Sequence, residues 1–215
     1  MSLTLYHYVH CPFCVRVRMT LGLLQLEYKS EVLAYNDETT PVNLTGKKML
    51  PILKHDQGAM NESLDIMTFL DKGNLLKIEA SRTFPEFGVF EAYLTHLGSM
   101  VHPLAMPYWM WTPEFDPTSR RYFQKTKEDK RGPFKDLVKK QPEYFEQLKQ
   151  EMPKLEQELV PFYKSEKLTV HDIMLASHLW GLYTVPEFQF SPNVHDYLQS
   201  VKQQCDFNYH QDYWV

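Results

Sequence analysis

A strand, a helix and a second strand follow one another near the start of the chain, and this order constrains the fold more than any other feature. Residues 3–9 (LTLYHYV) are rich in β-forming side chains and predict a strand. Pro12 suits the first turn of a helix, where its missing N–H has no intrahelical partner. Apolar residues then recur at helical spacing, and residues 28–35 return to strand character. This pattern predicts a βαβ unit with a right-handed crossover.

The next segment predicts a hairpin followed by a helix. Residues 39–48 (TTPVNLTGKK) form a short polar connection, and Pro51 begins an apolar strand over residues 51–54. Residues 55–58 (HDQG) indicate a tight turn into a second short strand. Glu62-Ser63 then opens a helix, and apolar residues at helical spacing predict one buried face: Leu64, Met67, Phe69 and Leu70.

Strand signals disappear after residue 72. From about residue 85 the sequence predicts helices interrupted by prolines, with most prolines expected where one helix stops and the next begins: Pro103, Pro107, Pro113, Pro117, Pro133, Pro142, Pro153, Pro161, Pro186 and Pro192. We therefore predict an α/β domain over residues 1–72, a linker over 73–84 and an all-helical domain over 85–215.

Composition excludes several classes of partner. The net charge of −4 over 215 residues is small, with no basic face for nucleic acid and no acidic tail. The N-terminal residues do not read as a signal peptide, and no apolar stretch is long enough to span a membrane. Three cysteines without an export signal fit a reducing compartment. We expect a cytoplasmic protein with no nucleic-acid or membrane partner.

Cys11 and Cys14 lie where the first strand meets the first helix. A cysteine reacts as its thiolate, and the free amides and partial positive charge at a helix N-terminus stabilise that form. At the N-cap, Cys11 is expected to have a pKa of about 3.5–7.5, against about 8.5 for a free cysteine. Cys14 lies one turn further on, within reach of Cys11 for a tight disulfide, and Pro12 stiffens the loop. This position favours a redox-active or nucleophilic pair.

Three other interpretations of the pair stay open on the residues alone. A zinc site needs four ligands, and Cys205 is the one other cysteine, far off in the chain, so we expect no metal. A permanent disulfide across two residues closes too small a loop to constrain the unfolded chain much. Chance burial of two thiols is the third. Positive charge from Arg16, Arg18 and, where protonated, His10 favours the reactive interpretation.

Two further stretches supply binding groups beside the cysteines. A cis bond before Pro51 would turn the backbone of Leu50 outward for an extended peptide, whereas a trans proline would simply begin an edge strand. Glu62-Ser63 at a helix start offers backbone amides and a hydroxyl to a carboxylate, or merely caps the helix. Together with Cys11, these groups match the carboxylate, backbone and sulfur of glutathione.

The motifs resemble a known family. Cys-Pro-Phe-Cys at 11–14, Leu-Pro-Ile-Leu at 50–53 and Glu-Ser at 62–63 resemble the glutaredoxin branch of the thioredoxin-fold superfamily. The helical domain is similar to that of glutathione transferases, including Thr169-Val170-His171-Asp172, which looks like the N-capping box of that domain. Over essentially the whole chain the sequence resembles the two-domain bacterial glutaredoxins of the glutaredoxin 2 family.

This resemblance implies a fold, a reaction and a ligand. The fold would be a thioredoxin-like domain followed by a transferase-like helical domain, with a cis bond before Pro51. Glutathione would be bound by Leu50, Glu62 and Ser63 beside Cys11. The resemblance implies an enzyme that reduces protein disulfides and protein–glutathione mixed disulfides, with glutathione as the electron donor.

Two competing functions use the same fold. A cysteine-type glutathione transferase would need Cys11 alone, and a non-enzymatic scaffold would need neither thiol, so Cys14 favours disulfide exchange. Phe13 stands where many glutaredoxins carry tyrosine, which places a hydrogen bond from that hydroxyl in doubt without affecting the thiol chemistry.

We expect three features of the helical domain to have a structural rather than a chemical role. The aromatic run 108–111 (YWMW) is expected to pack in the core or at the domain interface rather than to line a substrate groove. Cys205, in a late helix over about 194–204, is expected to be a buried, inert thiol. The charged run 125–131 (KTKEDKR) is expected to be solvated.

Overall fold

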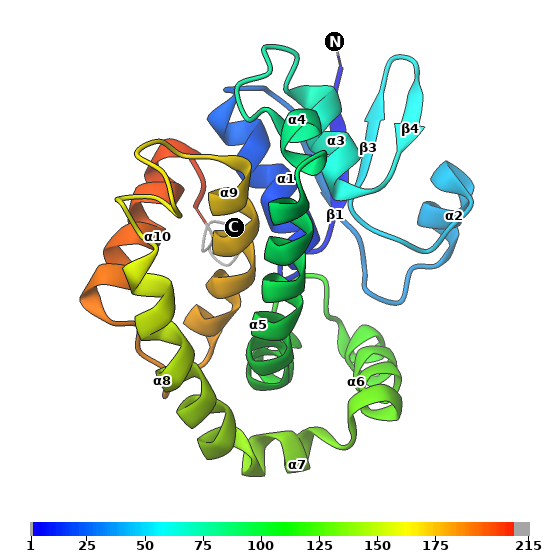
Figure 1. The fold of residues 1–215 in the computed structure, drawn as a ribbon. Helices are drawn as coiled ribbons and strands as arrows, with labels where there is room; N and C mark the ends of the chain where they lie inside the picture. Colours follow the sequence, from blue (N-terminus) through cyan, green and yellow to red (C-terminus); the bar gives the residue numbers. More distant parts are fainter. Residues whose placement is uncertain (1, 209–215) are drawn as a thin grey trace.

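Four strands form one mixed sheet in the order β2-β1-β3-β4 (Figure 1): β1 (Thr4–His7), β2 (Lys29–Val32), β3 (Ile52–His55) and β4 (Gly58–Met60). The structure is a computed structural model that describes residues 2–208. β1 pairs in parallel with β2 and antiparallel with β3, so that Leu5 lies opposite both Ser30 and Leu53. The predicted hairpin joins β3 to β4, with His55 opposite Gly58.

The first two strands are shorter than predicted because their ends bond elsewhere. The backbone N–H of Tyr8 donates to the Cys14 sulfur at 3.4 Å instead of to a neighbouring strand. The N–H of Tyr35 donates to the Glu114 carbonyl in the helical domain at 3.1 Å. Both departures from the sheet bring the chain toward the two cysteines.

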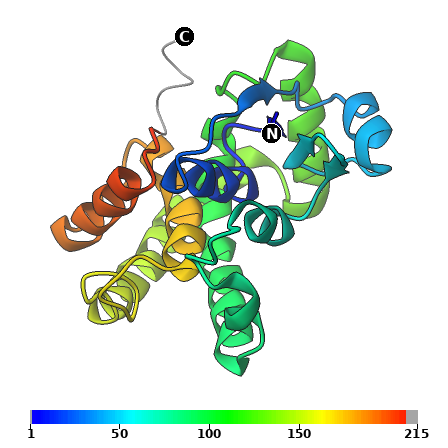
Figure 2. The same cartoon turned by 90° about the horizontal axis from the view of Figure 1, so that it is seen from above.

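Three helices accompany the sheet: α1 (Pro12–Leu23), α2 (Thr39–Thr45) and α3 (Ser63–Leu70). We predicted α1 and α3 but took the segment of α2 for a polar connection. Pro41 is the buried residue of α2, so the segment lacks the apolar periodicity that predicts a helix. α1 packs between α3 and the helical domain, as the view from above shows (Figure 2).

The named elements in the remainder of the described chain are all helices: α4 (Ile78–Arg82), α5 (Pro85–Trp109), α6 (Pro117–Arg131), α7 (Phe134–Lys139), α8 (Gln141–Gln157), α9 (Val170–Leu179), the 3-10 helix η1 (Trp180–Thr184) and α10 (Pro192–Gln204). The predicted class, an α/β thioredoxin-like domain followed by an all-α transferase-like domain, is confirmed. The boundaries at residues 72 and 85 stay a prediction, with α4 inside the predicted linker. Residues 209–215 of the predicted second domain lie outside the described residues.

The prolines only partly mark helix ends. Pro117 and Pro192 each begin a helix, as predicted. Pro103 and Pro107 instead lie inside α5, and Pro153 lies inside α8, so the prediction of a break at these three positions was wrong. An interior proline removes one backbone hydrogen bond, but tertiary packing overrides such local preferences.

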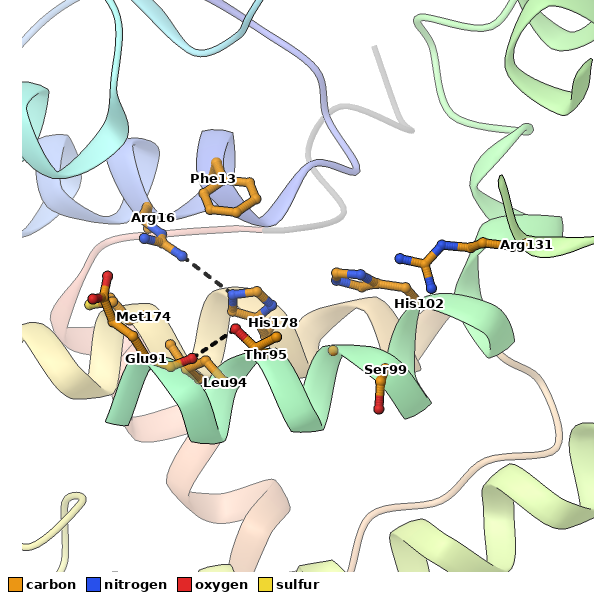
Figure 3. Close-up of a pocket in the computed structure, with 11 residues that line it drawn as sticks. Phe13, Arg16, Glu91, Leu94, Thr95, Ser99, His102, Arg131, Met174 and His178 are labelled. Carbon is orange, nitrogen blue, oxygen red and sulfur yellow. Dashed lines mark hydrogen bonds between the residues drawn. The ribbon is translucent and has the colours of Figure 1, made fainter. Parts of the chain in front are cut away.

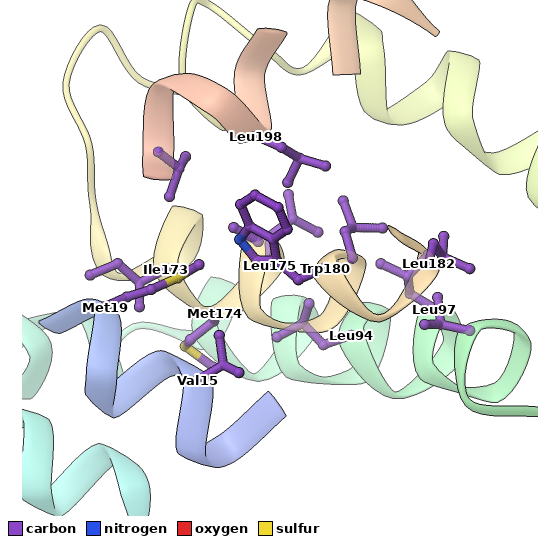
Figure 4. Close-up of a cluster of buried hydrophobic side chains, with 14 of the residues drawn as sticks. Val15, Met19, Leu94, Leu97, Ile173, Met174, Leu175, Trp180, Leu182 and Leu198 are labelled. Atoms are coloured by element: carbon purple, nitrogen blue, oxygen red, sulfur yellow. The ribbon is translucent and has the colours of Figure 1, made fainter. Parts of the chain in front are cut away.

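One continuous core joins the two domains (Figure 4). Val15 and Met19 of α1 belong to the same buried cluster as Leu94 of α5 and Ile173 and Met174 of α9. This arrangement explains why α1 has no solvent-facing polar stripe: even its arginines are buried. The helix that begins at Cys11 is therefore held from both domains.

The helical domain also contains the predicted capping box. Asp172 accepts hydrogen bonds from the backbone N–H of Thr169 at 2.7 Å and from its hydroxyl at 2.9 Å. The same carboxylate accepts from the Tyr163 backbone and the Tyr197 hydroxyl. Asp172 thus ties α9 to α10 as well as beginning the helix.

Gly22 in α1 provides a test of the packing between α1 and the end of α10. A Cβ at Gly22 would lie 1.9 Å from the Cys205 carbonyl oxygen, a backbone atom that cannot rotate away. We expect Gly22→Ala to destabilise the protein by about 1–3 kcal/mol, as overpacking of a core does. In urea unfolding, the matched change Gly88→Ala, at an open helical site, should instead stabilise by about 0.5–1 kcal/mol. Equal effects of the two changes would contradict this packing.

None of the helices within residues 2–208 is both long and apolar enough to cross a lipid bilayer.

Candidate active site

Cys11 caps α1, as predicted. Its backbone is extended, and its carbonyl accepts hydrogen bonds from the N–H groups of Cys14 and Val15, both at 2.9 Å. Pro12 occupies the first helical position. The Cys11 side chain is partly exposed, whereas Cys14 is fully buried one turn below it, and both thiols are free.

The two thiols differ strongly in acidity. A hydrogen bond from the Cys14 thiol lowers the pKa of Cys11 to about 6, with further help from the charge of His10 and from the amides of Cys14 and Phe13, which together outweigh partial burial. Burial, and then the hydrogen bond and charge of Cys11, raise the pKa of Cys14 well above its ordinary value. The pair therefore holds one proton on the inner sulfur, and the accessible sulfur is a thiolate at neutral pH.

Glu114 of the helical domain places a buried carboxylate beside His10, the residue that precedes Cys11. Glu114 Oε1 lies 2.5 Å from Nδ1 of His10 and also accepts from the His10 backbone N–H at 3.2 Å. Both side chains are almost completely buried. Burial alone would raise the pKa of Glu114, but the hydrogen bond and charge of His10 outweigh it and the pKa is lowered. The carboxylate is thus charged beside the residue that precedes Cys11.

Aromatic rings enclose this His10–Glu114 pair. The centroid of the His10 ring lies 5.0 Å from that of Trp109 and 5.2 Å from that of Phe115. The predicted packing of the 108–111 run holds for Trp109, which is buried at this interface, but Trp111 is 66% exposed under Arg120. The rings keep water away from the pair, which strengthens its electrostatic effect on the site.

Leu50, which precedes Pro51, lies against the same cysteines. The bond between them is cis, as the resemblance implied. Leu50 belongs to a small buried cluster with Cys14, and Cys11 packs against that cluster. Pairing between β1 and β3 begins only at Ile52, so the backbone of Leu50 lies outside the sheet ladder.

The start of α3 has no side-chain cap, which the interpretation of Glu62-Ser63 as a simple helix cap required. Neither Glu62 nor another side chain accepts a hydrogen bond at the N-cap, so the first amides of the helix have no acceptor among the described residues. Glu62 itself has φ of 72°, a conformation that non-glycine residues rarely adopt and that clusters at functional sites. Ser63, at the first helical position, is buried. Free amides at a helix start favour an anion.

Comparison with known proteins agrees with this geometry. A family model described as "Glutathione S-transferase, N-terminal domain" matches residues 5–74, and one described as "Glutaredoxin 2, C terminal domain" matches residues 90–213. The chain is 30% identical to Glutaredoxin 2 of Escherichia coli K12 over 209 residues, covering 95% of this chain and 96% of the relative. The chain belongs to the glutaredoxin 2 family. Its homology to a glutathione-dependent oxidoreductase identifies it as an enzyme of that class.

Solved structures extend the comparison to the fold. A crystal structure of Glutaredoxin 2 from Salmonella typhimurium in complex with glutathione superposes with a TM-score of 0.85, at 30% identity and 96% coverage of both chains. A glutathione S-transferase of Ceriporiopsis subvermispora in complex with glutathione superposes with a TM-score of 0.71 at 16% identity, covering 96% of this chain and 97% of that one. The second match, at so low an identity, supports the shared fold alone.

Two further predictions concern Cys205 and the absence of a metal. Cys205 is buried, and burial raises its pKa to about 12, in agreement with an inert thiol. Within residues 2–208, no cluster of three His, Cys, Asp or Glu side chains could hold a metal ion. That the protein uses no metal stays a prediction.

Sequence reasoning missed two contributions from the helical domain. Glu114 was not considered, and Lys127 was expected to be solvated with its charged neighbours. Lys127 is instead partly buried, with its ammonium 5.5 Å from the Phe123 ring centroid. Burial lowers the pKa of Lys127, and the negative charge of Cys11 opposes that shift, so the two groups lie within electrostatic reach. The sequence carried no signal for either contact.

The acidity of Cys11 predicts a pH profile for alkylation. Because the thiolate reacts and its pKa is lowered to about 6, the rate with iodoacetamide should rise with pH and reach half its plateau near pH 6. Cys14→Ala removes the largest stabilising hydrogen bond, so its half-point should move upward toward that of an ordinary cysteine. A wild-type midpoint near pH 9, or no upward movement in Cys14→Ala, would contradict this description of the pair.

Proposed function

We propose that Cys11 is the nucleophile of a glutathione-dependent thiol–disulfide oxidoreductase that reduces protein–glutathione mixed disulfides and protein disulfides. The observation that carries this proposal is the asymmetric pair: an accessible, acidic thiol at the N-cap of α1 above a buried, weakly acidic one. A thiolate beside a protonated resolving thiol is the arrangement that thiol–disulfide exchange needs. Protein substrates and a cytoplasmic location are part of this proposal.

Glutathione would lie across Cys11, Leu50 and the start of α3. The Leu50 backbone, outside the sheet ladder, would pair with the peptide backbone of glutathione as an added strand. The γ-glutamyl carboxylate would accept from the first amides of α3 and the Ser63 hydroxyl, where no side chain caps the helix. The unusual backbone of Glu62 orients these amides. The glutathione complex of the Salmonella relative supports such a site in this chain.

The reaction proceeds by successive exchanges. The Cys11 thiolate attacks one sulfur of the substrate disulfide, the S–S bond breaks, and one thiolate leaves. In the dithiol route Cys14 loses its proton and attacks the Cys11 sulfur, which releases the reduced substrate and leaves a Cys11–Cys14 disulfide. Two glutathione molecules reduce that disulfide and leave as glutathione disulfide. The reduction potential expected for glutaredoxins is about −200 to −230 mV, close to that of the glutathione pool.

In the monothiol route Cys11 alone takes the glutathionyl group from a modified protein. A second glutathione then attacks the bound glutathione sulfur, forms glutathione disulfide and releases the Cys11 thiolate. Phe13 supplies no hydroxyl to either route, and its ring is instead 46% exposed beside the cysteines.

Two other functions would use the same site. A cysteine-type transferase would conjugate glutathione to an electrophile and would have no need of Cys14. A non-enzymatic scaffold would have no need of an acidic thiol. The buried Cys14, which lowers the pKa of Cys11, favours exchange over both.

A paired assay tests this proposal. We expect glutathione-coupled turnover of a small mixed disulfide, and little conjugation of chlorodinitrobenzene measured beside it with the same preparation. Strong conjugation without disulfide turnover would identify a transferase. The absence of both activities in protein whose thiols are fully reduced would favour the scaffold.

A further inference from the structure

A pocket lies between the two domains, on the side of α1 that faces α5 and α9. Its cavity volume is about 390 Å³, the size of a small-molecule site. Phe13, two residues after Cys11, forms part of its wall, and Leu94 and Met174 add apolar surface. Figure 3 shows Arg16 and Glu91 at one end of this pocket, and His102 and Arg131 at the other.

Arg16 is the unusual member of the lining. Its side chain is 4% exposed, and its guanidinium lies 4.7 Å from the Phe13 ring centroid. Nη2 donates to Nε2 of His178 at 3.3 Å, whereas Nε has no partner among the described residues. A buried cation is costly unless a counter-charge accompanies it, and within residues 2–208 no carboxylate forms an ion pair with Arg16. The Cys11 thiolate and the Glu91 carboxylate act on Arg16, but neither forms an ion pair with its guanidinium in the described part of the chain, so the pocket has room for a further anion there.

Two histidines of the pocket lining, His102 and His178, add uncharged hydrogen-bonding groups. Burial lowers the pKa of His102 to about 4, and burial with the charge of Arg16 lowers that of His178 well below its ordinary range. Because Nε2 of His178 accepts from Arg16, its Nδ1 carries the proton, and it finds no acceptor in the described part of the chain. Nε2 of His102 is likewise buried without a partner. An apolar ligand would leave all of these groups unsatisfied.

Three charged side chains line the pocket: Arg16, Glu91 and Arg131. Arg16 is the cation at the inner end, and the exposed carboxylate of Glu91 lies near enough to interact with it without pairing. Arg131, at the end of α6, is an exposed cation at the other end. A matching ligand carries a carboxylate and an ammonium together at one end and a second carboxylate at the other.

Glutathione has this pattern: its γ-glutamyl end carries a carboxylate and an ammonium, and its glycine end carries a carboxylate. We propose that the pocket between α1, α5 and α9 binds the second glutathione, the one that attacks the mixed disulfide on Cys11. Arg16 and Glu91 would hold its γ-glutamyl end, and Arg131 its glycine carboxylate. This inference rests on the proposed function, because the first glutathione, bonded to Cys11, then occupies the separate site at Leu50 and α3.

The step balances without another reactant. The thiolate of the second glutathione attacks the sulfur of the bound glutathione, the bond between that sulfur and Cys11 Sγ breaks, and Cys11 leaves as the thiolate. Glutathione disulfide is the product: the attacking glutathione is oxidised, Cys11 is reduced to its thiolate, and the sulfur of the first glutathione stays in a disulfide. The charge of Arg16 also lies within reach of Cys11, so it favours the departing thiolate.

A single-turnover experiment isolates this step. Cys14→Ser protein carrying glutathione on Cys11, verified by mass, is mixed with glutathione, with cysteinylglycine (no γ-glutamyl end) or with γ-glutamylcysteine (no glycine). The rate constant of Cys11 release is recorded for each thiol at equal thiolate concentration. The ratio between two thiols in one variant cancels any effect of a substitution on the mixed disulfide itself.

We expect glutathione to react faster than either shorter thiol. Arg16→Met and Glu91→Gln should each reduce the preference over cysteinylglycine about tenfold, the scale of a charge-assisted hydrogen bond. Arg131→Ala should reduce the preference over γ-glutamylcysteine and leave the other ratio unchanged. Glu86→Gln, which removes a carboxylate from α5 outside this pocket, is the matched control and should change neither ratio.

Two outcomes would overturn the inference in distinguishable ways. If the mixed disulfide forms on Cys11 but the ratios are equal to one, or are unchanged in Glu91→Gln and Arg131→Ala, the pocket does not bind the second glutathione. These two residues are exposed, so the result stands even if Arg16→Met fails to fold. If no mixed disulfide forms on Cys11, the proposed function fails and the pocket assignment fails with it.

Discussion

Cys11→Ser should lower the glutathione-coupled reduction of a small mixed disulfide to the uncatalysed background. A hydroxyl at the N-cap of α1 cannot supply the thiolate that this position stabilises. Cys14→Ser should retain activity within about tenfold of the wild type, because in the monothiol route glutathione resolves the intermediate. Steady-state rates of the two variants with the same mixed disulfide check this prediction.

A protein disulfide as substrate separates the two routes. There Cys14→Ser should lose most of its activity, because the dithiol route needs the inner thiol. Cys205→Ser is the matched control, since that thiol is buried and weakly acidic, and it should change neither activity. An inactive Cys14→Ser beside an active Cys11→Ser would reverse the roles that we assign.

Glu114→Ala should destabilise the protein by about 3–5 kcal/mol, the effect of removing one partner from a buried ion pair. His10 would then be left with aromatic neighbours and no counter-charge. Urea unfolding monitored by circular dichroism measures the change. A loss below about 1 kcal/mol, the usual value for an exposed pair, would show that the contact contributes little.

The conservative change Glu114→Gln separates the charge of this residue from its packing. The amide keeps an acceptor for the His10 backbone but removes the negative charge beside the ring. Because the charge of His10 lowers the pKa of Cys11, we expect the alkylation midpoint to move upward from about pH 6. Glu114 is thus a positioning residue. An unchanged midpoint in a folded Glu114→Gln protein would limit Glu114 to a structural contribution.

Local patterns predicted the parts of the site that lie close together in the sequence. Cys11, Cys14 and Pro12 occupy one strand-to-helix junction, so their geometry followed from the position of the helix start. Leu50-Pro51 and the start of α3 were predicted in the same way. Together with Cys11 they matched the parts of glutathione, and the resemblance implied the same ligand; that they form one glutathione site stays a prediction.

Long-range contacts explain what the sequence did not reveal. Glu114 reaches His10 across 104 residues of chain, and no periodicity connects such positions. Arg16 was expected to add positive charge near the cysteines and Lys127 to be solvated, but the sequence did not indicate that packing between the domains buries Arg16 almost completely and Lys127 in part. α2 was not predicted because it buries little apolar surface. The prolines inside α5 were wrongly predicted to end a helix because tertiary packing overrides local preference there.

Locating glutathione on the chain tests whether Cys11 is the nucleophile. Reduced Cys14→Ser protein is treated with glutathione disulfide at pH 7, and the modified peptide is mapped by mass spectrometry. We expect one glutathione per chain, attached to Cys11 by a bond that reducing agents break. Glutathione attached to Cys205, or no modification while Cys11 stays free and accessible, would contradict this role of Cys11.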